Sequence, residues 1–203
     1  MKWSILSKGK LITVSWLLFI VLTLMVMLGL LKEIDLYFIG NVPEFEGILL
    51  HVLVFISFIA NIYTVFSIVI LISLYSYFKR KSVKWSLALF LSIVFVSIAT
   101  FIIKNVTAIP RPYNVESVYP LTVESYSYPS GHVSRFTVIC YYLSKKFKHT
   151  KLFMMFLLIL VAFSRILLLQ HYLSDVLGGF SLGLAISLST EIILEYRKYS
   201  VKY

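Results

Sequence analysis

The sequence predicts an all-α, polytopic membrane protein with six transmembrane helices in a single domain covering residues 1–203. The first indication is composition: 60% of the residues are hydrophobic and 14% are charged, whereas soluble domains have about 45–50% and about 25%. The second is that the apolar residues form long runs of about 20 residues, the length that crosses a bilayer. The single cysteine, Cys140, excludes an intrachain disulfide and argues against a cysteine-based metal site.

Six apolar segments are the candidate spans. In chain order they are Leu11–Leu31, Ile48–Phe78, Trp85–Ile103, Val133–Leu143, Leu152–Leu169 and Leu173–Leu194. The first is longer than the core of a signal peptide and lacks a following cleavage site, so we expect it to be retained. The second is too long for a simple span, and we expect it to tilt or to extend beyond the bilayer. The fourth is too short to cross the bilayer by itself, so flanking residues at both ends must extend the helix.

The basic residues predict the orientation. Fourteen of the nineteen Lys and Arg residues lie before the first span, between the second and third, between the fourth and fifth, or after the sixth. The positive-inside rule then places both termini in the cytoplasm, in a multi-pass protein of the cell membrane. The net charge of +10 therefore needs no nucleic-acid partner, because its residues are spread over four short segments.

Three cations remain at or near the outward ends of the predicted helices. They are Lys104, Arg111 and Arg165, and snorkelling to lipid headgroups would be the simplest use for each. An anion with several oxygens would satisfy all three, because Arg binds phosphate oxygens in a bidentate way and Lys adds a point charge. Ser130 and Gly131 stand before the fourth span, where a helix start with a glycine favours phosphate. These five residues form a candidate phosphate-binding site.

Two histidines and one aspartate stand beside this candidate site. His171 and Asp175 are four residues apart, which places them on one face of a helix. The carboxylate would orient the imidazole as a nucleophile, and His132 could protonate a leaving oxygen. The same three side chains could instead hold a metal ion. The neighbouring cations would repel such an ion, so we expect no metal.

Three ordered segments of the chain resemble the signature of the type 2 phosphatidic acid phosphatase superfamily. The family pattern is Lys-x6-Arg-Pro, then Pro-Ser-Gly-His, then Ser-Arg-x5-His-x3-Asp. The chain matches it at Lys104–Pro112, Pro129–His132 and Ser164–Asp175, with no departure at a signature position. The six-span layout is similar to the membrane-bound branch of that family.

The resemblance implies a mechanism and a set of roles. His171 would form a phosphohistidine, Asp175 would orient it, and His132 would protonate the leaving group and later help to activate water. The phosphoryl oxygens would be held by Lys104, Arg111, Ser130, Gly131 and Arg165. The family uses no metal, and we expect no cofactor. Phosphoryl transfer depends mainly on positioning and charge stabilisation, which such a site supplies.

The substrate is expected to be a lipid phosphate that presents its headgroup at the extracytoplasmic membrane interface. Because the chain is compact, we favour a polyprenyl diphosphate of the undecaprenyl or dolichyl type. Phosphatidylglycerophosphate or phosphatidic acid is the alternative. An anion transporter or channel, and a catalytically inactive lipid-binding relative, remain more distant alternatives. The Tyr-rich stretch Tyr113–Tyr128 is expected to cover the site.

Overall fold

The computed structural model describes residues 2–79, 83–113 and 126–200, and this part of the chain is almost entirely helical. The elements are α1 (Lys2–Met27), α2 (Lys32–Gly40), α3 (Gly47–Ile59), α4 (Ile62–Phe78), α5 (Val83–Thr107), α6 (Gly131–Lys146), the 3-10 helix η2 (Lys148–Thr150), α7 (Lys151–Leu167) and α8 (Leu173–Ser200). Within the described ranges, the sole β-pairing is an isolated bridge between Pro110 and Tyr126. The predicted all-α class is confirmed.

The number of spans differs from the predicted six. Four segments are long and apolar enough to cross a membrane, namely Lys8–Met27, Val83–Thr107, Lys148–Leu167 and Leu173–Leu194, and the α3–α4 pair would make a fifth. The predicted fourth span corresponds to α6, which has 16 residues. At 1.5 Å per residue such a helix is about 24 Å long, shorter than a hydrocarbon core of about 30 Å. The described residues therefore supply four or five complete spans, with α6 packed among them.

The predicted second span is broken into α3 and α4, which are bent by 46°. Asn61 stands at the break with an extended backbone, and its side-chain oxygen accepts the Tyr63 N–H at 2.9 Å. The carboxamide therefore caps α4, since capping oxygens satisfy the N–H groups that a helix start leaves unpaired. The long apolar run is therefore two helices, and the expectation that it forms one tilted span is wrong for this reason.

Helices α6 and α8 form the centre of the bundle. Helix α8 packs against α6, α1 and α5, and α6 also packs against α7 and α5. A methyl group added to Gly183 of α8 would lie 2.4 Å from the Ser134 carbonyl oxygen of α6. Only a glycine fits at this distance, so the two backbones approach closely, as in many membrane helix pairs. The bundle's outer surface is lined by exposed apolar side chains.

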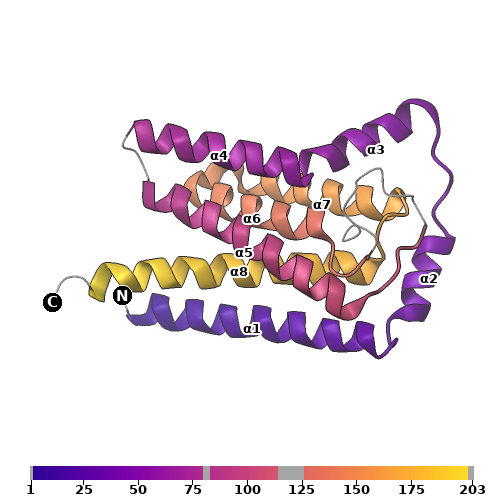
Figure 1. The fold of residues 1–203 in the computed structure, drawn as a ribbon, viewed down its shortest axis with the longest axis horizontal. Coiled ribbons are helices and arrows are strands. Elements are labelled where there is room, and N and C mark those ends of the chain that lie inside the picture. Colours follow the sequence, from indigo (N-terminus) through magenta and orange to yellow (C-terminus); the bar gives the residue numbers. More distant parts are fainter. Residues whose placement is uncertain (1, 80–82, 114–125, 201–203) are drawn as a thin grey trace.

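One end of the bundle gathers the segments that carry the predicted site. The ends of α5 and α7 and the starts of α6 and α8 lie together there, beside the short helix α2, whereas both termini lie at the opposite end (Figure 1). Helix α2 was not predicted. Asp35 of α2 accepts the Ser174 N–H at 2.9 Å and the Ser174 hydroxyl at 2.6 Å, which attaches α2 to the start of α8.

Some predictions concern residues that the structure does not describe. The expected cover over the site, Tyr113–Tyr128, lies mostly outside the described residues, because residues 114–125 are not described. Residues 80–82 of the second basic cluster also lie outside the described residues. Which end of the bundle faces the cytoplasm stays a prediction from the positive-inside rule.

Candidate active site

The centre of the candidate site is the contact between His171 and Asp175. His171 Nδ1 lies 3.2 Å from Asp175 Oδ2, and both side chains are buried. The expectation that both residues lie on one helix is wrong, because α8 begins at Leu173 and His171 precedes it. Asp175 instead reaches back over the start of α8, where its Oδ2 also accepts the Tyr172 N–H at 2.8 Å. The two side chains meet as expected, through a different local structure.

The other ring nitrogen of His171 faces the interior of the site. Nε2 is buried and makes no hydrogen bond to the residues that the structure describes. With Nδ1–H directed at the carboxylate, the neutral ring carries its lone pair on Nε2. Burial lowers the pKa of His171 well below its ordinary value, and the charges of Arg111, Lys104 and Arg165 lower it further. The ring is therefore neutral near pH 7, as a nitrogen nucleophile requires.

Ser127 is a third member of this group that the sequence analysis missed. Its hydroxyl donates a short hydrogen bond to Asp175 Oδ2 and lies 3.4 Å from His171 Nδ1. Ser127 is fully buried, and its N–H donates to the Ile109 carbonyl at 2.7 Å. A buried carboxylate needs such donors, so Ser127 fixes the oxygen atom that faces the imidazole. Its place directly before Tyr128-Pro129 was the available signal.

The predicted cations Lys104 and Arg111 hold the segments around the dyad. Lys104, in the last turn of α5, is 4% exposed and donates to the carbonyls of Tyr126 and Ser127, the latter at 3.2 Å. Arg111 donates to the side-chain oxygen of Gln170 at 2.8 Å and more weakly to its carbonyl at 3.4 Å. Both cations therefore stand beside His171 and fix the loops that flank it.

Arg165 organises the turn that carries the histidine. Its guanidinium donates a short hydrogen bond to the Ser57 hydroxyl of α3, and the side chain is 6% exposed. Its carbonyl accepts the N–H groups of Gln170 at 3.0 Å and His171 at 3.2 Å. Leu169, within this turn, has a φ of 53°, a conformation that costs of order 1–3 kcal/mol for a residue other than glycine. Such strain is common at functional sites.

The start of α6 completes the site. The Ser130 N–H donates to the Asp175 carbonyl at 3.0 Å, and the Ser130 hydroxyl oxygen accepts the Val133 N–H at 3.5 Å. This capping role uses the oxygen as an acceptor and leaves the hydroxyl hydrogen for an anion. Gly131 and His132 follow in the first turn of α6. Burial lowers the pKa of His132 well below its ordinary value, and the charges of the neighbouring cations lower it further. The structure thus brings all eight predicted site residues to one end of the bundle.

Two further residues near the site were not named in the sequence analysis. Arg135 of α6 is buried, and its charge acts on His132. Gln170, which receives Arg111, carried no signal beyond its position directly before His171. Within the described ranges, no group of three or more His, Cys, Asp or Glu residues is arranged to hold a metal ion.

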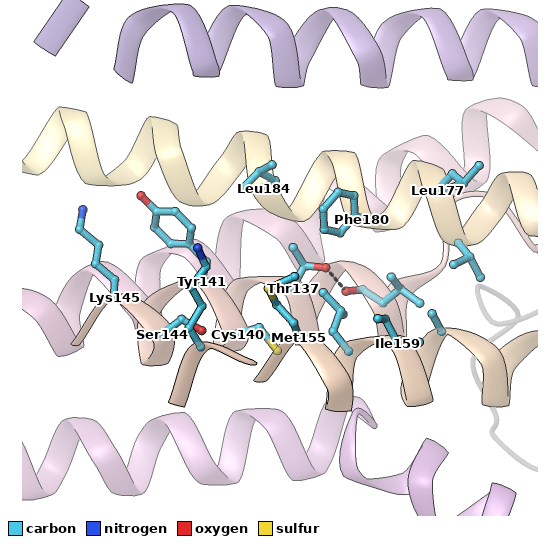
Figure 2. A pocket seen from close by; sticks show the side chains of 15 residues that line it. Thr137, Cys140, Tyr141, Ser144, Lys145, Met155, Ile159, Leu177, Phe180 and Leu184 are labelled. Atoms are coloured by element: carbon cyan, nitrogen blue, oxygen red, sulfur yellow. Dashed lines mark hydrogen bonds between the residues drawn. The ribbon is translucent and has the colours of Figure 1, made fainter. Parts of the chain in front are cut away.

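An apolar cavity of about 720 Å³ lies next to the site, between α6, α7 and α8. Figure 2 shows Leu177, Phe180 and Leu184 of α8 on one side of it and Met155 and Ile159 of α7 on another. The lining also includes Val133 and Val176, which directly follow His132 and Asp175 in the sequence, and it extends to Lys145 and Lys151. The cavity therefore runs from the starts of α6 and α8 toward the opposite end of the bundle.

The fold is that of a helical membrane protein, and one end of its bundle holds a buried His–Asp pair beside several cations. Such a site is suited to binding a phosphate group. Residues 85–199 match the model of the PAP2 superfamily, and the chain belongs to this superfamily. The resemblance seen in the sequence is thereby confirmed.

A curated protein and a solved structure, both from Bacillus subtilis, are similar to this chain. Phosphatidylglycerophosphatase B of strain 168 is 43% identical over 77 residues, which cover 32% of this chain and 38% of that protein. The chain thus matches somewhat more than a third of the length of this curated relative. The crystal structure described as the first transmembrane PAP2-type phosphatidylglycerolphosphate phosphatase has a TM-score of 0.77, with 23% identity, over 91% of this chain and 96% of that one. This likeness confirms the fold of a multi-pass membrane protein.

Proposed function

We propose that this protein is a membrane phosphatase that removes the terminal phosphate of a lipid through a phosphohistidine intermediate. The observation that carries the proposal is the buried His171–Asp175 pair. His171 Nε2 makes no hydrogen bond to the described residues, and the charges of Lys104, Arg111 and Arg165 act on this imidazole. The cations would neutralise the phosphoryl oxygens, and the neutral imidazole would supply the nucleophile.

The geometry supports a two-step reaction. In the first step, the lone pair of His171 Nε2 forms a bond to phosphorus as the bond from phosphorus to the leaving oxygen breaks. Asp175 stabilises the positive charge that the imidazole acquires. His132, which takes up a proton when the phosphate anion binds beside it, gives that proton to the leaving oxygen. In the second step, water attacks phosphorus, His132 takes its proton, and the N–P bond breaks to release inorganic phosphate and neutral His171. Neither step calls for a metal, and we propose metal-independent catalysis by one domain, residues 1–203.

Phosphatidylglycerophosphate is the substrate that we favour. Both relatives described above carry this activity in their names, and the alternative substrate from the sequence analysis therefore has better support than the main one. Polyprenyl diphosphate stays a prediction. The apolar cavity between α6, α7 and α8 would accept a hydrocarbon chain of the lipid while its headgroup reaches His171. We propose that this headgroup arrives at the extracytoplasmic interface.

Phosphate release by the purified full-length protein tests the proposal. The substrates are phosphatidylglycerophosphate, phosphatidic acid and a polyprenyl diphosphate, each assayed with EDTA present. We expect release by the wild type and none above background by His171→Ala. His51→Ala is the matched control, because His51 is an exposed residue of α3 that bonds to Gly47 within its own helix. Near-wild-type turnover by folded His171→Ala would contradict the nucleophile assignment, and loss of activity in EDTA would contradict metal independence.

Anion transport is separated from catalysis by the same assay. A transporter would bind phosphate without releasing it from a lipid, and its function would not require the contact between His171 and Asp175. If the purified protein released no phosphate from any of the three lipids, the proposed function would be wrong.

A further inference from the structure

A polar contact joins the short helix α2 to the start of α8. Asp35 Oδ1 accepts the Ser174 N–H at 2.9 Å, and Asp35 Oδ2 accepts the Ser174 hydroxyl at 2.6 Å. Both residues are buried, with Asp35 8% exposed and Ser174 3% exposed. Helix α2 lies outside residues 85–199, the part of the chain that the superfamily model matches. Asp35 is therefore no part of the matched pattern.

This contact caps α8 from another helix. The N–H groups in the first turn of a helix have no acceptor within that helix. Because α8 begins at Leu173, the Ser174 N–H is one of these groups, and Asp35 supplies its acceptor. A carboxylate at this end of a helix also interacts favourably with the helix dipole. Since Asp35 holds the hydroxyl as well, Ser174 is fixed through both its main chain and its side chain.

The fixed residue directly precedes Asp175. Asp175 Oδ2 accepts the Tyr172 N–H at 2.8 Å and lies 3.2 Å from His171 Nδ1. The main-chain carbonyl of Asp175 accepts the Ser130 N–H at 3.0 Å. All three contacts depend on how the first turn of α8 is oriented. The contact from α2 therefore bears on the carboxylate that faces the imidazole.

Attachment of α2 to the bundle does not depend on this contact alone. Ile39 of α2 and Val42, which follows the helix, pack against a buried cluster of Val133, Ile166 and Val176. Apolar packing is non-directional, whereas two hydrogen bonds to one residue set its orientation. Loss of the Asp35 carboxylate should therefore leave α2 in place and disturb the orientation of the α8 start.

We propose that Asp35 is a positioning residue, which acts through Ser174 on the Asp175 carboxylate that orients His171. This inference rests on the proposed phosphatase function and adds a residue to the same site. Asp35 transfers no proton and forms no bond to phosphorus. It holds the start of α8 so that Asp175 stays directed at Nδ1 of His171 while Nε2 attacks.

The test measures kcat and KM separately for phosphate release from phosphatidylglycerophosphate by the full-length protein. We expect Asp35→Ala to lower kcat about tenfold or more, the effect of losing a hydrogen bond to a charged group. KM should change less than about threefold, as for substitutions away from the bound ligand. Glu33→Ala is the matched control with unchanged kcat, because Glu33 is an exposed acid in the first turn of the same helix.

The conservative variant Asp35→Asn separates the contact from the charge. Its side-chain oxygen can accept the Ser174 N–H, and its amide can donate to the Ser174 hydroxyl oxygen. We therefore expect Asp35→Asn to keep kcat within about threefold of the wild type. A loss in Asp35→Asn as large as that in Asp35→Ala would overturn the inference, because this variant keeps the contact.

A double-mutant cycle tests whether Asp35 acts through Ser174. Ser174→Ala removes the hydroxyl contact and keeps the N–H contact, so we expect kcat to fall about three- to tenfold, the effect of one hydrogen bond. The variant that combines Asp35→Ala with Ser174→Ala should be about as slow as Asp35→Ala alone, because residues in direct contact do not contribute additively. Losses that multiply in the double variant would overturn the inference. Ser174→Ala also provides the test if Asp35→Ala does not fold, and unchanged kcat in Ser174→Ala would count against the inference.

Two further outcomes have separate meanings. A rise in KM alone for Asp35→Ala would overturn the inference, and would instead favour headgroup binding in the cavity of about 360 Å³ that Asp35, Lys32 and Tyr172 help to line. Absence of phosphate release by the wild type would refute the proposed function itself, and the wild-type assay shows this before any variant is compared. An active wild type together with a folded Asp35→Ala protein of unchanged kcat would refute the positioning role alone.

Discussion

The change Ser127→Ala tests whether the Ser127 hydroxyl positions the His171–Asp175 pair. The hydroxyl donates to Asp175 Oδ2 and lies 3.4 Å from His171 Nδ1. After the substitution, Oδ2 keeps the Tyr172 N–H at 2.8 Å and the imidazole at 3.2 Å. The variant therefore loses one of three hydrogen bonds to this oxygen and keeps the nucleophile.

The expected magnitude follows from that single loss. A hydrogen bond to a charged group contributes about 1.5–3 kcal/mol, and each 1.36 kcal/mol in the activation free energy changes a rate about tenfold. We therefore expect kcat to fall about 10- to 100-fold. KM should change little, because the Ser127 hydroxyl contacts His171 and Asp175, whereas the phosphate would be held by the cations, which are unchanged in this variant.

The assay is phosphate release from phosphatidylglycerophosphate at several substrate concentrations, which separates kcat from KM. Ser92→Ala is the matched control, because Ser92 is an equally buried serine whose hydroxyl bonds to Tyr142 in the middle of the bundle. A folded Ser127→Ala protein with unchanged kcat would refute the positioning role. A rise in KM alone would show that Ser127 serves substrate binding instead.

Three further predictions concern the dyad, the helix packing and the topology. Asp175→Asn should lower kcat at least about 10²-fold and leave vanadate inhibition nearly unchanged. Arg165→Ala should weaken both turnover and vanadate inhibition. Equal losses of vanadate affinity in the two variants would contradict the separate roles of Asp175 in orientation and Arg165 in anion binding. Gly183→Ala should destabilise the protein by about 1–3 kcal/mol, because the added methyl group would lie 2.4 Å from a carbonyl oxygen of α6. A melting temperature in detergent equal to that of the wild type would argue against close packing of α6 and α8 at this position. In intact cells of a Cys140→Ser background, an impermeant thiol reagent should label a cysteine at position 120, which lies outside the described residues, and not one at 148; the reverse pattern would invert the topology.

The sequence predicted the helical class and the neighbourhood of the site residues, because both depend on strong local signals. Long apolar runs have few stable alternatives to membrane helices, and the spacing of Lys104, His132 and His171 matched a known pattern. The break at Asn61 was not predicted, because a polar residue in an apolar run can either bond across helices or cap a new helix. Only the backbone conformation distinguishes the two.

The residues missed at the site share a physical reason. The position of Ser127 relative to the histidine depends on a contact between segments that are distant in the sequence. The burial of Arg135 depends on how α6 packs within the bundle. The place of Ser127 directly before Tyr128-Pro129 is a weak signal, and an arginine in a helix carries no pattern of its own. Helix α2 was missed because it has nine residues and begins with the charged residues Lys32, Glu33 and Asp35, and its position depends on the hydrogen bond that Ser174 donates to Asp35.

Asp175 serves the site with two chemically independent parts. Its carboxylate faces His171, while its main-chain carbonyl accepts the Ser130 N–H at 3.0 Å and so joins the starts of α6 and α8. A substitution of the side chain leaves the carbonyl in place. In evolutionary terms, a single codon change could therefore remove the proposed catalysis while the main-chain connection between α6 and α8 is inherited intact. Descendants of such a chain could become lipid-binding proteins without passing through an unfolded ancestor.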